Sequence, residues 1–384
     1  MQKNNNTKML KNKRDSWRFI MSITIGGRVV GNDTKTLIIA EAGINHDGKL
    51  EQAYQLIDIA ADAGADVVKF QLFTAAHMYP IKAGKLRTAN GMDMEIYPLI
   101  KEMEVPEEWI PKLINKCKER DIGFLCTTCD ETSTDLLNKY SVDSFKIASS
   151  EITHIPLLRH TANTGKTVIF SEGAAKMSEV CEAIDAIKAT GNEKIALMHC
   201  TAEYPAKLSD CNTNIIETYR RIFPDVIIGF SDHTSEPSTA PVQAILKGAK
   251  IIEKHITIDR KLPGADHSFA LEYNQLKQLV QDVRFAEEHL DQIIYNDVIG
   301  GRTDKIVLDD EKKLRSFVHR GIFSYKDIKA GETLTTNNMI VLRPGNCENG
   351  IEPRFFDMLI EKKVCVNNNI SSNCPIKWDD VLNF

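Results

Sequence analysis

The chain has 384 residues, a net charge of −5 and 42% hydrophobic residues, as in an ordinary soluble globular protein. This charge gives no reason to expect nucleic-acid binding, and no apolar stretch is long enough to cross a bilayer, so we expect neither partner. The nine cysteines are scattered, which indicates free thiols in a reducing compartment and favours a cytoplasmic location.

The chain begins with a polar stretch that is rich in Asn and Lys. Residues 1–20 are basic but lack the apolar core of a signal peptide, so we predict a disordered extension. The next ten residues, MSITIGGRVV (21–30), predict a β-hairpin that could close the bottom of a barrel.

Short apolar runs that end in reactive side chains then alternate with segments of helical periodicity. The apolar runs are 37–43, 66–73, 122–130, 144–151, 167–173, 195–204, 226–234 and 250–257. The helical segments are 50–63, 106–120, 178–190, 213–222, 235–247 and 272–290, with weaker ones at 131–140 and 155–162. This alternation predicts an α/β fold, a (β/α)8 TIM barrel over residues 21–295.

The last quarter of the chain has a different pattern. Residues 296–313 contain Gly and Asp after the last helical segment, so we predict a linker there. Residues 314–384 mix short β-like runs with turns, which indicates a small β-rich domain.

Two histidines stand at the ends of the last two predicted strands, His233 and His255. The carboxyl ends of parallel strands are where such barrels build their sites, so we predict that both bind one divalent metal. Side chains alternate along a strand, which places Ser231 with His233, Glu253 with His255, and Lys69 with Gln71. Glu41 is in phase with the inward residues of the first strand.

Cationic and hydroxyl side chains at the other strand ends predict an anionic substrate. They are Lys69, Lys146, Thr127, Ser149, Ser171 and Ser231, all possible donors to phosphate or carboxylate oxygens. A divalent ion nearby would polarise a carbonyl. The implied chemistry is attack on an aldehyde by an enol phosphate.

Several motifs together resemble the bacterial sialic acid synthase family, which includes N-acetylneuraminate, legionaminic acid and pseudaminic acid synthases. They are IAEAGINHDG (39–48), VKFQ (68–71), FKIAS (145–149), HCTAEYP (199–205), FSDHT (230–234), EKHIT (253–257) and PGADHS (263–268). In the tail, KDIKAGE (326–332) and LRPG (342–345) resemble the SAF, or antifreeze-like, domain of that family. The resemblance covers residues 22–384.

The resemblance implies that the enzyme condenses phosphoenolpyruvate with an N-acetylated hexosamine to give a nonulosonic acid and phosphate. It implies Mn²⁺, with Mg²⁺ or Co²⁺ as alternatives, on His233 and His255, and imidazole ligands favour a transition metal. Carbon–carbon bond formation would precede attack of water at C2 and loss of phosphate. The remaining implied roles are phosphoenolpyruvate binding by Lys69, Gln71, Thr127, Lys146, Ser149, Ser171 and Ser231; orientation of sugar or water by Glu41; and sugar contacts by Tyr204, Glu253 and Asp266. Arg343 would reach the barrel of a partner subunit in a domain-swapped homodimer.

Some positions depart from the family pattern. Ala202 stands where Asn is common, Glu172 where Thr is common and Cys126 where Ser is common, and the loop after Arg343 has extra residues. We expect these changes to leave the chemistry intact. They leave open whether the acceptor is N-acetylmannosamine or a 2,4-diacetamido-6-deoxy analogue.

Other interpretations compete with this one. A class I aldolase would use Lys69 or Lys146 as a Schiff base and needs no metal. A synthase of the keto-deoxy-octulosonate type would lack the SAF-like tail, and a carbohydrate-binding module on an inactive barrel would not need both histidines and both lysines. Lone strand-end histidines are commonly structural, as we expect for His199, and the lysines could simply pair with Glu41 or Asp66. The pair Cys126 and Cys129 imitates a redox motif but lacks a thioredoxin-like context.

Overall fold

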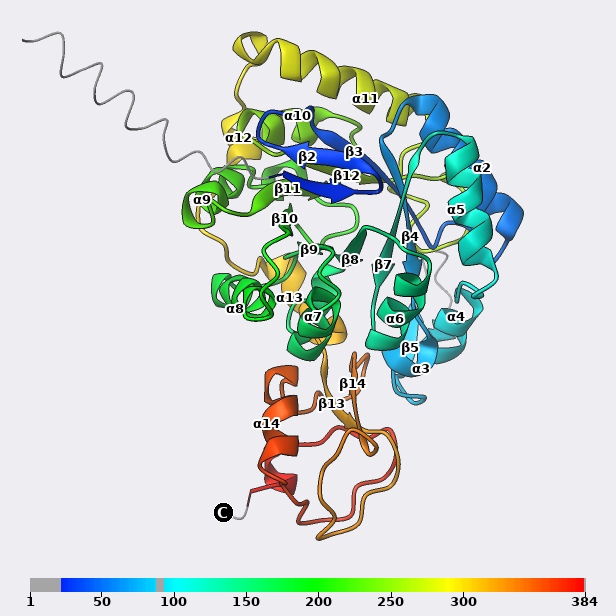
Figure 1. Ribbon diagram of the computed structural model, residues 1–384, viewed down its shortest axis with the longest axis vertical. Coiled ribbons are helices and arrows are strands. Elements are labelled where there is room, and N and C mark those ends of the chain that lie inside the picture. Colours follow the sequence, from blue (N-terminus) through cyan, green and yellow to red (C-terminus); the bar gives the residue numbers. More distant parts are fainter. Residues whose placement is uncertain (1–21, 88–92, 383–384) are drawn as a thin grey trace, which may run out of the picture.

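Figure 1 shows the computed structural model, which describes residues 22–87 and 93–382. Eight parallel strands close into a barrel. They are β3 (Leu37–Gly43), β4 (Val67–Leu72), β7 (Gly123–Thr128), β8 (Ser144–Ile147), β9 (Thr167–Ser171), β10 (Ile195–Cys200), β11 (Ile227–Asp232) and β12 (Ile251–His255). Each strand pairs with the next along the chain, and β12 pairs with β3. The predicted (β/α)8 barrel is therefore confirmed.

Helices surround the barrel, and each segment predicted to be helical contains one (Figure 1). They are α2 (Leu50–Ala63), α5 (Trp109–Glu119), α6 (Glu131–Lys139), α7 (Ile155–Ala162), α8 (Met177–Lys188), α9 (Asn214–Ile222), α10 (Thr239–Leu246) and α11 (Tyr273–Glu288). Helix α2 has the predicted bounds because Gly64 takes the left-handed conformation, φ 87°, that ends it. Helix α10 begins four residues later than predicted, because the ammonium of Lys254 binds the carbonyls of Thr234 and Glu236 in the preceding loop.

The predicted hairpin is also present, as β1 (Ser22–Ile25) and β2 (Arg28–Gly31), paired antiparallel. Its apolar side chains Ile23, Ile25 and Val30 are buried against inward residues of the barrel strands. The hairpin turn fits closely there, since a Cβ on Gly123 would lie 2.4 Å from the carbonyl oxygen of Gly26. The extension expected at residues 1–20 lies outside the described residues.

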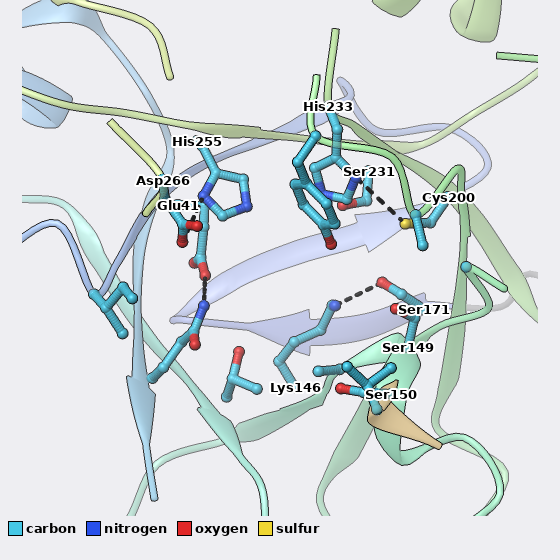
Figure 2. A pocket seen from close by; sticks show the side chains of 18 of the residues that line it. Glu41, Lys146, Ser149, Ser150, Ser171, Cys200, Ser231, His233, His255 and Asp266 are labelled. Atoms are coloured by element: carbon cyan, nitrogen blue, oxygen red, sulfur yellow. Dashed lines mark hydrogen bonds and ion pairs between the residues drawn. The ribbon is translucent and has the colours of Figure 1, made fainter. Parts of the chain in front are cut away.

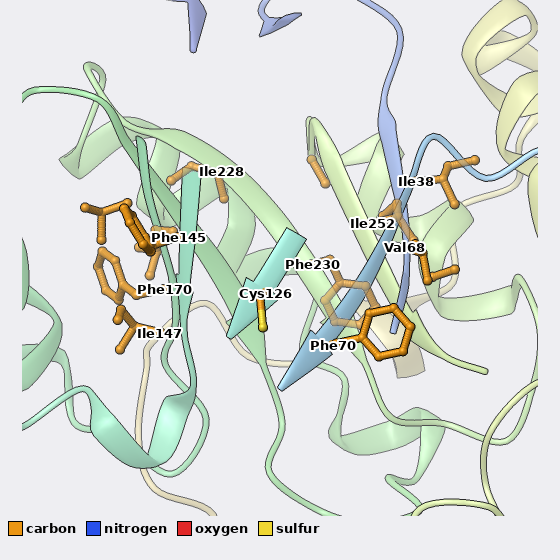
Figure 3. Close-up of a cluster of buried hydrophobic side chains, with 14 of the residues drawn as sticks. Ile38, Val68, Phe70, Cys126, Phe145, Ile147, Phe170, Ile228, Phe230 and Ile252 are labelled. Atoms are coloured by element: carbon orange, nitrogen blue, oxygen red, sulfur yellow. The ribbon is translucent and has the colours of Figure 1, made fainter. Parts of the chain in front are cut away.

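The main core lies between the barrel and its helices. Outward-pointing strand residues form it, for example Ile38, Val68, Phe145 and Phe230 (Figure 3). Because successive strand residues point to opposite faces, the intervening residues point into the barrel. Apolar residues fill its lower part, which leaves the polar strand ends at the top free to form a site.

Short elements follow β4 and β12. After β4 come α3 (Ala75–Met78), the hairpin strands β5 (Lys85–Arg87) and β6 (Asp93–Glu95), and α4 (Ile96–Glu102). After α11, the stretch 296–313 that we expected to be a linker contains α12 (Asp297–Gly300) and the start of α13 (Asp309–Val318). It packs on the barrel because Lys305 and Glu311 are both buried there. Single 3-10 turns occur at Ser149–Glu151, Leu208–Asp210, Leu290–Gln292, Pro353–Phe355 and Trp378–Asp380.

The C-terminal residues form a small unit with its own core, next to one end of the barrel (Figure 1). Strands β13 (Gly321–Ser324) and β14 (Met339–Leu342) pair antiparallel, three isolated antiparallel bridges follow, and α14 (Phe356–Glu361) covers one side. Ile322, Leu334 and Ile376 are among its fully buried residues. Within the described part of the chain, no helix is long and apolar enough to span a membrane.

Candidate active site

The polar strand ends surround a cavity of about 260 Å³ (Figure 2). Every side chain that the sequence assigned to the site lines this cavity. Each of the eight barrel strands or the loop after it contributes at least one of them, which is why residues far apart in sequence meet here. The register brings Glu41 beside both Lys69 and His255, and Ser231 beside Glu253.

His233 and His255 lie side by side, with ring centroids 5.4 Å apart. Nδ1 of His233 donates a hydrogen bond to the carbonyl oxygen of Thr201 at 2.9 Å, which fixes the tautomer and leaves Nε2 as the nitrogen with a lone pair. Nδ1 of His255 is buried and has no hydrogen-bond partner. Burial lowers the pKa of both imidazoles, and the neighbouring His233 lowers that of His255 further.

This pair fits a divalent metal ion. Both imidazoles are neutral, which ligation requires, and an unpaired buried ring nitrogen is costly unless something binds it. The carboxylate of Asp266 lies 3.7 Å from Nδ1 of His255 and adds an oxygen donor on the same side. Imidazole ligands favour a transition-metal ion over Mg²⁺.

The two lysines have different surroundings. Nζ of Lys69 lies 2.6 Å from Glu41 and 3.6 Å from Glu253, and it donates to Thr127 at 3.1 Å. Burial alone would lower the pKa of Lys69, but these two carboxylates raise it overall. Nζ of Lys146 donates to Ser171 at 2.6 Å, and its one carboxylate within 4 Å among the described residues is Glu253, at 3.8 Å (Figure 2). Burial therefore lowers the pKa of Lys146, whose charge is the less compensated of the two.

Glu253, for which the resemblance implied a sugar contact, lines the cavity next to the cationic residues. It lies between the two lysines and accepts a hydrogen bond from Ser231 at 3.0 Å, so it belongs to the anion-binding side. Burial would raise the pKa of Glu253, but Lys146 and Lys69 lower it overall, so the carboxylate is ionised. The ionised carboxylate of Glu253 thus lies on the side of the cavity where a substrate anion would bind.

Two further carboxyl groups lie nearer the histidines. Glu41 accepts a hydrogen bond from Gln71 at 2.8 Å, and burial raises its pKa although Lys69 opposes the shift. Burial, together with the charge of Glu41, raises the pKa of Asp266 to about 7. Carboxyl groups with raised pKa values can accept or donate a proton near neutral pH.

Tyr204 and Arg343 line the outer part of the cavity. The Tyr204 ring packs on His233 at 4.3 Å between centroids. Arg343 lies in the barrel of its own chain, where it binds Glu151 and Ser150 at 2.7 Å each. The C-terminal unit lies on the barrel of the same chain, and the Arg343 N–H bonds to the carbonyl of Met78. The contact of Arg343 with a partner's barrel stays a prediction. The homodimer itself stays a prediction, which light scattering in solution would test.

The three residues that depart from the family pattern, Ala202, Glu172 and Cys126, differ in whether they line the cavity. Ala202 lines the cavity, but Glu172 is fully buried behind it, where it pairs with Lys305 at 2.5 Å and binds His199 and Tyr219. His199 is thus the packed residue that we expected. Cys126 points into the outer apolar core (Figure 3), and burial raises the pKa values of Cys126 and Cys129, so neither thiol is ionised as a redox motif needs.

Sequence reasoning missed several residues of the site. Leu314 and Val318 of α13 line the cavity, and Glu151 holds Arg343. The four-residue spacing of Leu314 and Val318 indicates one helix face, but nothing local to that stretch indicates which surface it covers. Elsewhere, the carboxylates of Glu203, Asp210 and Asp310 converge as a metal site would, yet the Lys207 ammonium already lies within 4 Å of all three and pairs with them.

The same residues connect this chain to known proteins. A model described as the NeuB family matches residues 56–295, well over half of the chain. The chain belongs to the NeuB family. It is 47% identical to the spore coat polysaccharide biosynthesis protein SpsE of Bacillus subtilis, over 93% of this chain and 96% of that protein. It is 36% identical to the N,N'-diacetyllegionaminic acid synthase of Campylobacter jejuni, over 81% and 91% of the two chains.

Solved structures of NeuB-like proteins agree with the fold. The crystal structure of Bacillus subtilis SpsE matches with a TM-score of 0.84, covering 95% of this chain and all of that one. The N-acetylneuraminic acid synthetase of Leptospira borgpetersenii, solved with citrate, matches with a TM-score of 0.63 at 33% identity, covering 72% of this chain and 92% of that one. This NeuB-family chain therefore has homologues that are named as synthases of sialic-type acids.

Proposed function

We propose that this NeuB-family protein condenses phosphoenolpyruvate with an N-acetylated aminosugar, in the presence of a divalent metal, to give a nonulosonic acid and phosphate. The observation that carries the proposal is one cavity in which an under-compensated lysine faces serine hydroxyls on one side and two neutral histidines lie on the other. The names of the relatives, which are synthases of such acids, support the same reaction.

The anion would bind on the Lys146 side. Lys146, Ser171, Ser149 and Ser231 offer donors to phosphate and carboxylate oxygens, with Thr127 and Lys69 next to them. Gln71 bonds Glu41 and places it between this side and the histidines. The same buried donors would stabilise the charge that develops on phosphate as the carbon–oxygen bond breaks.

The sugar would bind on the histidine side. His233 and His255 would hold the metal, whose Lewis acidity makes an aldehyde carbon more electrophilic. Tyr204 and Arg343 line the part of the cavity where a sugar can lie, and Asp266, with its pKa of about 7, can exchange a proton with a hydroxyl. Glu41, whose pKa is raised by burial, is placed to accept a proton from the water that attacks C2.

The acceptor sugar is proposed from the relatives. The 36% identity to an N,N'-diacetyllegionaminic acid synthase favours a 2,4-diacetamido-2,4,6-trideoxyhexose over N-acetylmannosamine. The two sugars differ by groups that a few loop residues recognise, so both must be tested.

The test is phosphate release from phosphoenolpyruvate by purified protein with Mn²⁺ and each sugar in turn, with and without EDTA. We expect release that EDTA abolishes, with one sugar preferred. Borohydride is added in parallel, because a class I aldolase would be trapped on Lys69 or Lys146 whereas the proposed enzyme would not. Turnover that resists EDTA, together with covalent trapping by borohydride, would instead indicate a class I aldolase.

Lys146→Met is expected to lower kcat/KM for phosphoenolpyruvate by about ten- to a hundredfold, because one charge-assisted hydrogen bond contributes roughly 1.5–3 kcal/mol. The methionine keeps the length of the side chain and removes its charge. Lys82→Met is a matched control, since Lys82 is exposed and outside the cavity. Steady-state kinetics at fixed sugar measure the effect, and an unchanged kcat/KM for phosphoenolpyruvate would contradict the anion-binding role of Lys146.

A further inference from the structure

Helix α13 closes one side of the cavity, although its start was expected to be linker. Leu314 and Val318 line the cavity directly. Glu311, one turn before Leu314, does not line it, but it is only 1% exposed and lies against the ends of β9 and β10. The post-barrel segment therefore brings a buried carboxylate to the strands that carry the phosphate-side residues.

The carboxylate of Glu311 accepts three backbone N–H groups. Oε1 accepts from Ala174 at 2.8 Å and from Ala202 at 2.9 Å, and Oε2 accepts from Leu308 at 2.9 Å. Ala174 lies just after β9 and Ala202 just after β10, and both line the cavity. One buried side chain thus connects the ends of two neighbouring barrel strands.

The backbone of Ala174 is in a conformation that needs support. Its φ is 57°, in the left-handed region that residues with a Cβ avoid. Arg315, one turn after Glu311, donates to the carbonyl oxygen of Ala174 at 2.6 Å and pairs with Glu179. Helix α13 therefore binds both the N–H and the C=O of this residue. A strained conformation of this kind persists only where the surroundings fix it.

We propose that Glu311 is a positioning residue for the phosphate side of the active site. Ser171, which binds Lys146, lies three residues before Ala174, and Tyr204 lies two residues after Ala202. By fixing both strand ends, Glu311 holds Ser171 beside Lys146 on the side of the cavity where phosphate would bind. The inference rests on the proposed function for the identity of the ligand, phosphoenolpyruvate.

Removal of the carboxylate would leave two buried N–H groups without a partner and release the strained Ala174. Glu311→Ala is therefore expected to raise the Kd and KM for phosphoenolpyruvate by about tenfold or more, with a smaller change in KM for the sugar. Glu311→Gln keeps an oxygen that can accept both N–H groups, so it is expected to restore most of the affinity. Asp310→Ala, on the exposed face of the same helix, is the matched control and should leave both constants unchanged.

Two measurements test the proposal on the full-length protein. Calorimetric titration with phosphoenolpyruvate gives Kd without turnover, and steady-state kinetics give the two KM values separately. Hydrogen exchange measured on peptides that contain Ala174 and Ala202 reports the strand ends directly. We expect faster exchange at both amides in Glu311→Ala, protection in Glu311→Gln, and no change in a peptide from α2.

The outcomes separate the two proposals. If the wild-type protein does not bind phosphoenolpyruvate, the proposed function fails, whereas exchange at Ala174 and Ala202 still decides whether Glu311 holds these strand ends. Unchanged exchange in Glu311→Ala would overturn the positioning role. So would a fall in kcat and thermal stability accompanied by an equal rise in both KM constants that Glu311→Gln does not rescue, because that pattern indicates general loss of the fold.

Discussion

Replacing His255 with Ala is expected to lower phosphate release by about a thousandfold and to abolish tight binding of Mn²⁺. Lewis-acid polarisation of a carbonyl contributes several kcal/mol, and each 1.36 kcal/mol corresponds to about a tenfold change in rate. His255→Ala removes one of the two imidazoles of the site, and Nδ1 of His255 is buried without a hydrogen-bond partner that would compete with the ion. His233→Ala should have a similar effect.

Metal content by mass spectrometry and Mn²⁺ binding by electron paramagnetic resonance measure the ion, and the phosphate assay measures the rate. His160→Ala is a suitable control, because His160 is a partly exposed residue of α7, outside the cavity, and pairs with Asp135. Circular dichroism establishes that each variant is folded. A His255→Ala protein that retains its metal and its EDTA-sensitive turnover would show that the ion binds elsewhere.

The second large effect is expected on the stability of the folded protein when the ion pair between Glu172 and Lys305 is broken. Lys305→Met is expected to lower the free energy of unfolding by about 3–5 kcal/mol, because it leaves the carboxylate of Glu172 buried without its cation. Glu172 is 0% exposed, and burial would raise its pKa if Lys305 and His199 did not lower it. Urea unfolding measures the loss, and Lys207→Met, which removes the ion pairs of an exposed ammonium, serves as the control.

The pH dependence follows from the direction of the Glu172 shift. A carboxyl whose pKa is lowered in the folded state stabilises the protein above its ordinary pKa, and this stabilisation is lost as the pH falls through the lowered value. In Lys305→Met the buried Glu172 takes up a proton more readily. The difference in the free energy of unfolding between this variant and wild type should therefore decrease as the pH is lowered from 8 to 5. The double variant Glu172→Gln/Lys305→Met should recover most of the stability at pH 8. This account would be contradicted if the free energies of unfolding of wild type and Lys305→Met differed by less than about 1 kcal/mol at pH 8, or if their difference grew at acidic pH.

Much of the fold and the site could be predicted because the information is local. Apolar runs that end in polar residues indicated all eight barrel strands, and the alternation of side chains indicated which residues point inward. In a parallel barrel all strand ends face the same opening, so His233, His255 and Lys146 had to meet once the strands were known. The hairpin at the bottom of the barrel could also be predicted, from its turn and its apolar residues.

What the sequence could not show are contacts that depend on how distant segments pack. Glu311 binds Ala174 and Ala202 across 137 and 109 residues, and no periodicity in the stretch 296–313 indicates that a charged residue there is buried. The departure at Glu172 was visible in the sequence, but its counter-ion Lys305 was not.

The amino-acid sequence by itself therefore determined the barrel, the inward faces of its strands and the polar strand-end side chains that line the cavity. Only the tertiary structure decided how these side chains are paired: Glu253 between the two lysines, Arg343 on Glu151 of the same chain, and α13 against the ends of β9 and β10. The physical reason is that strand periodicity sets the direction of a side chain, whereas its partner depends on barrel closure and on the packing of segments far away in the chain.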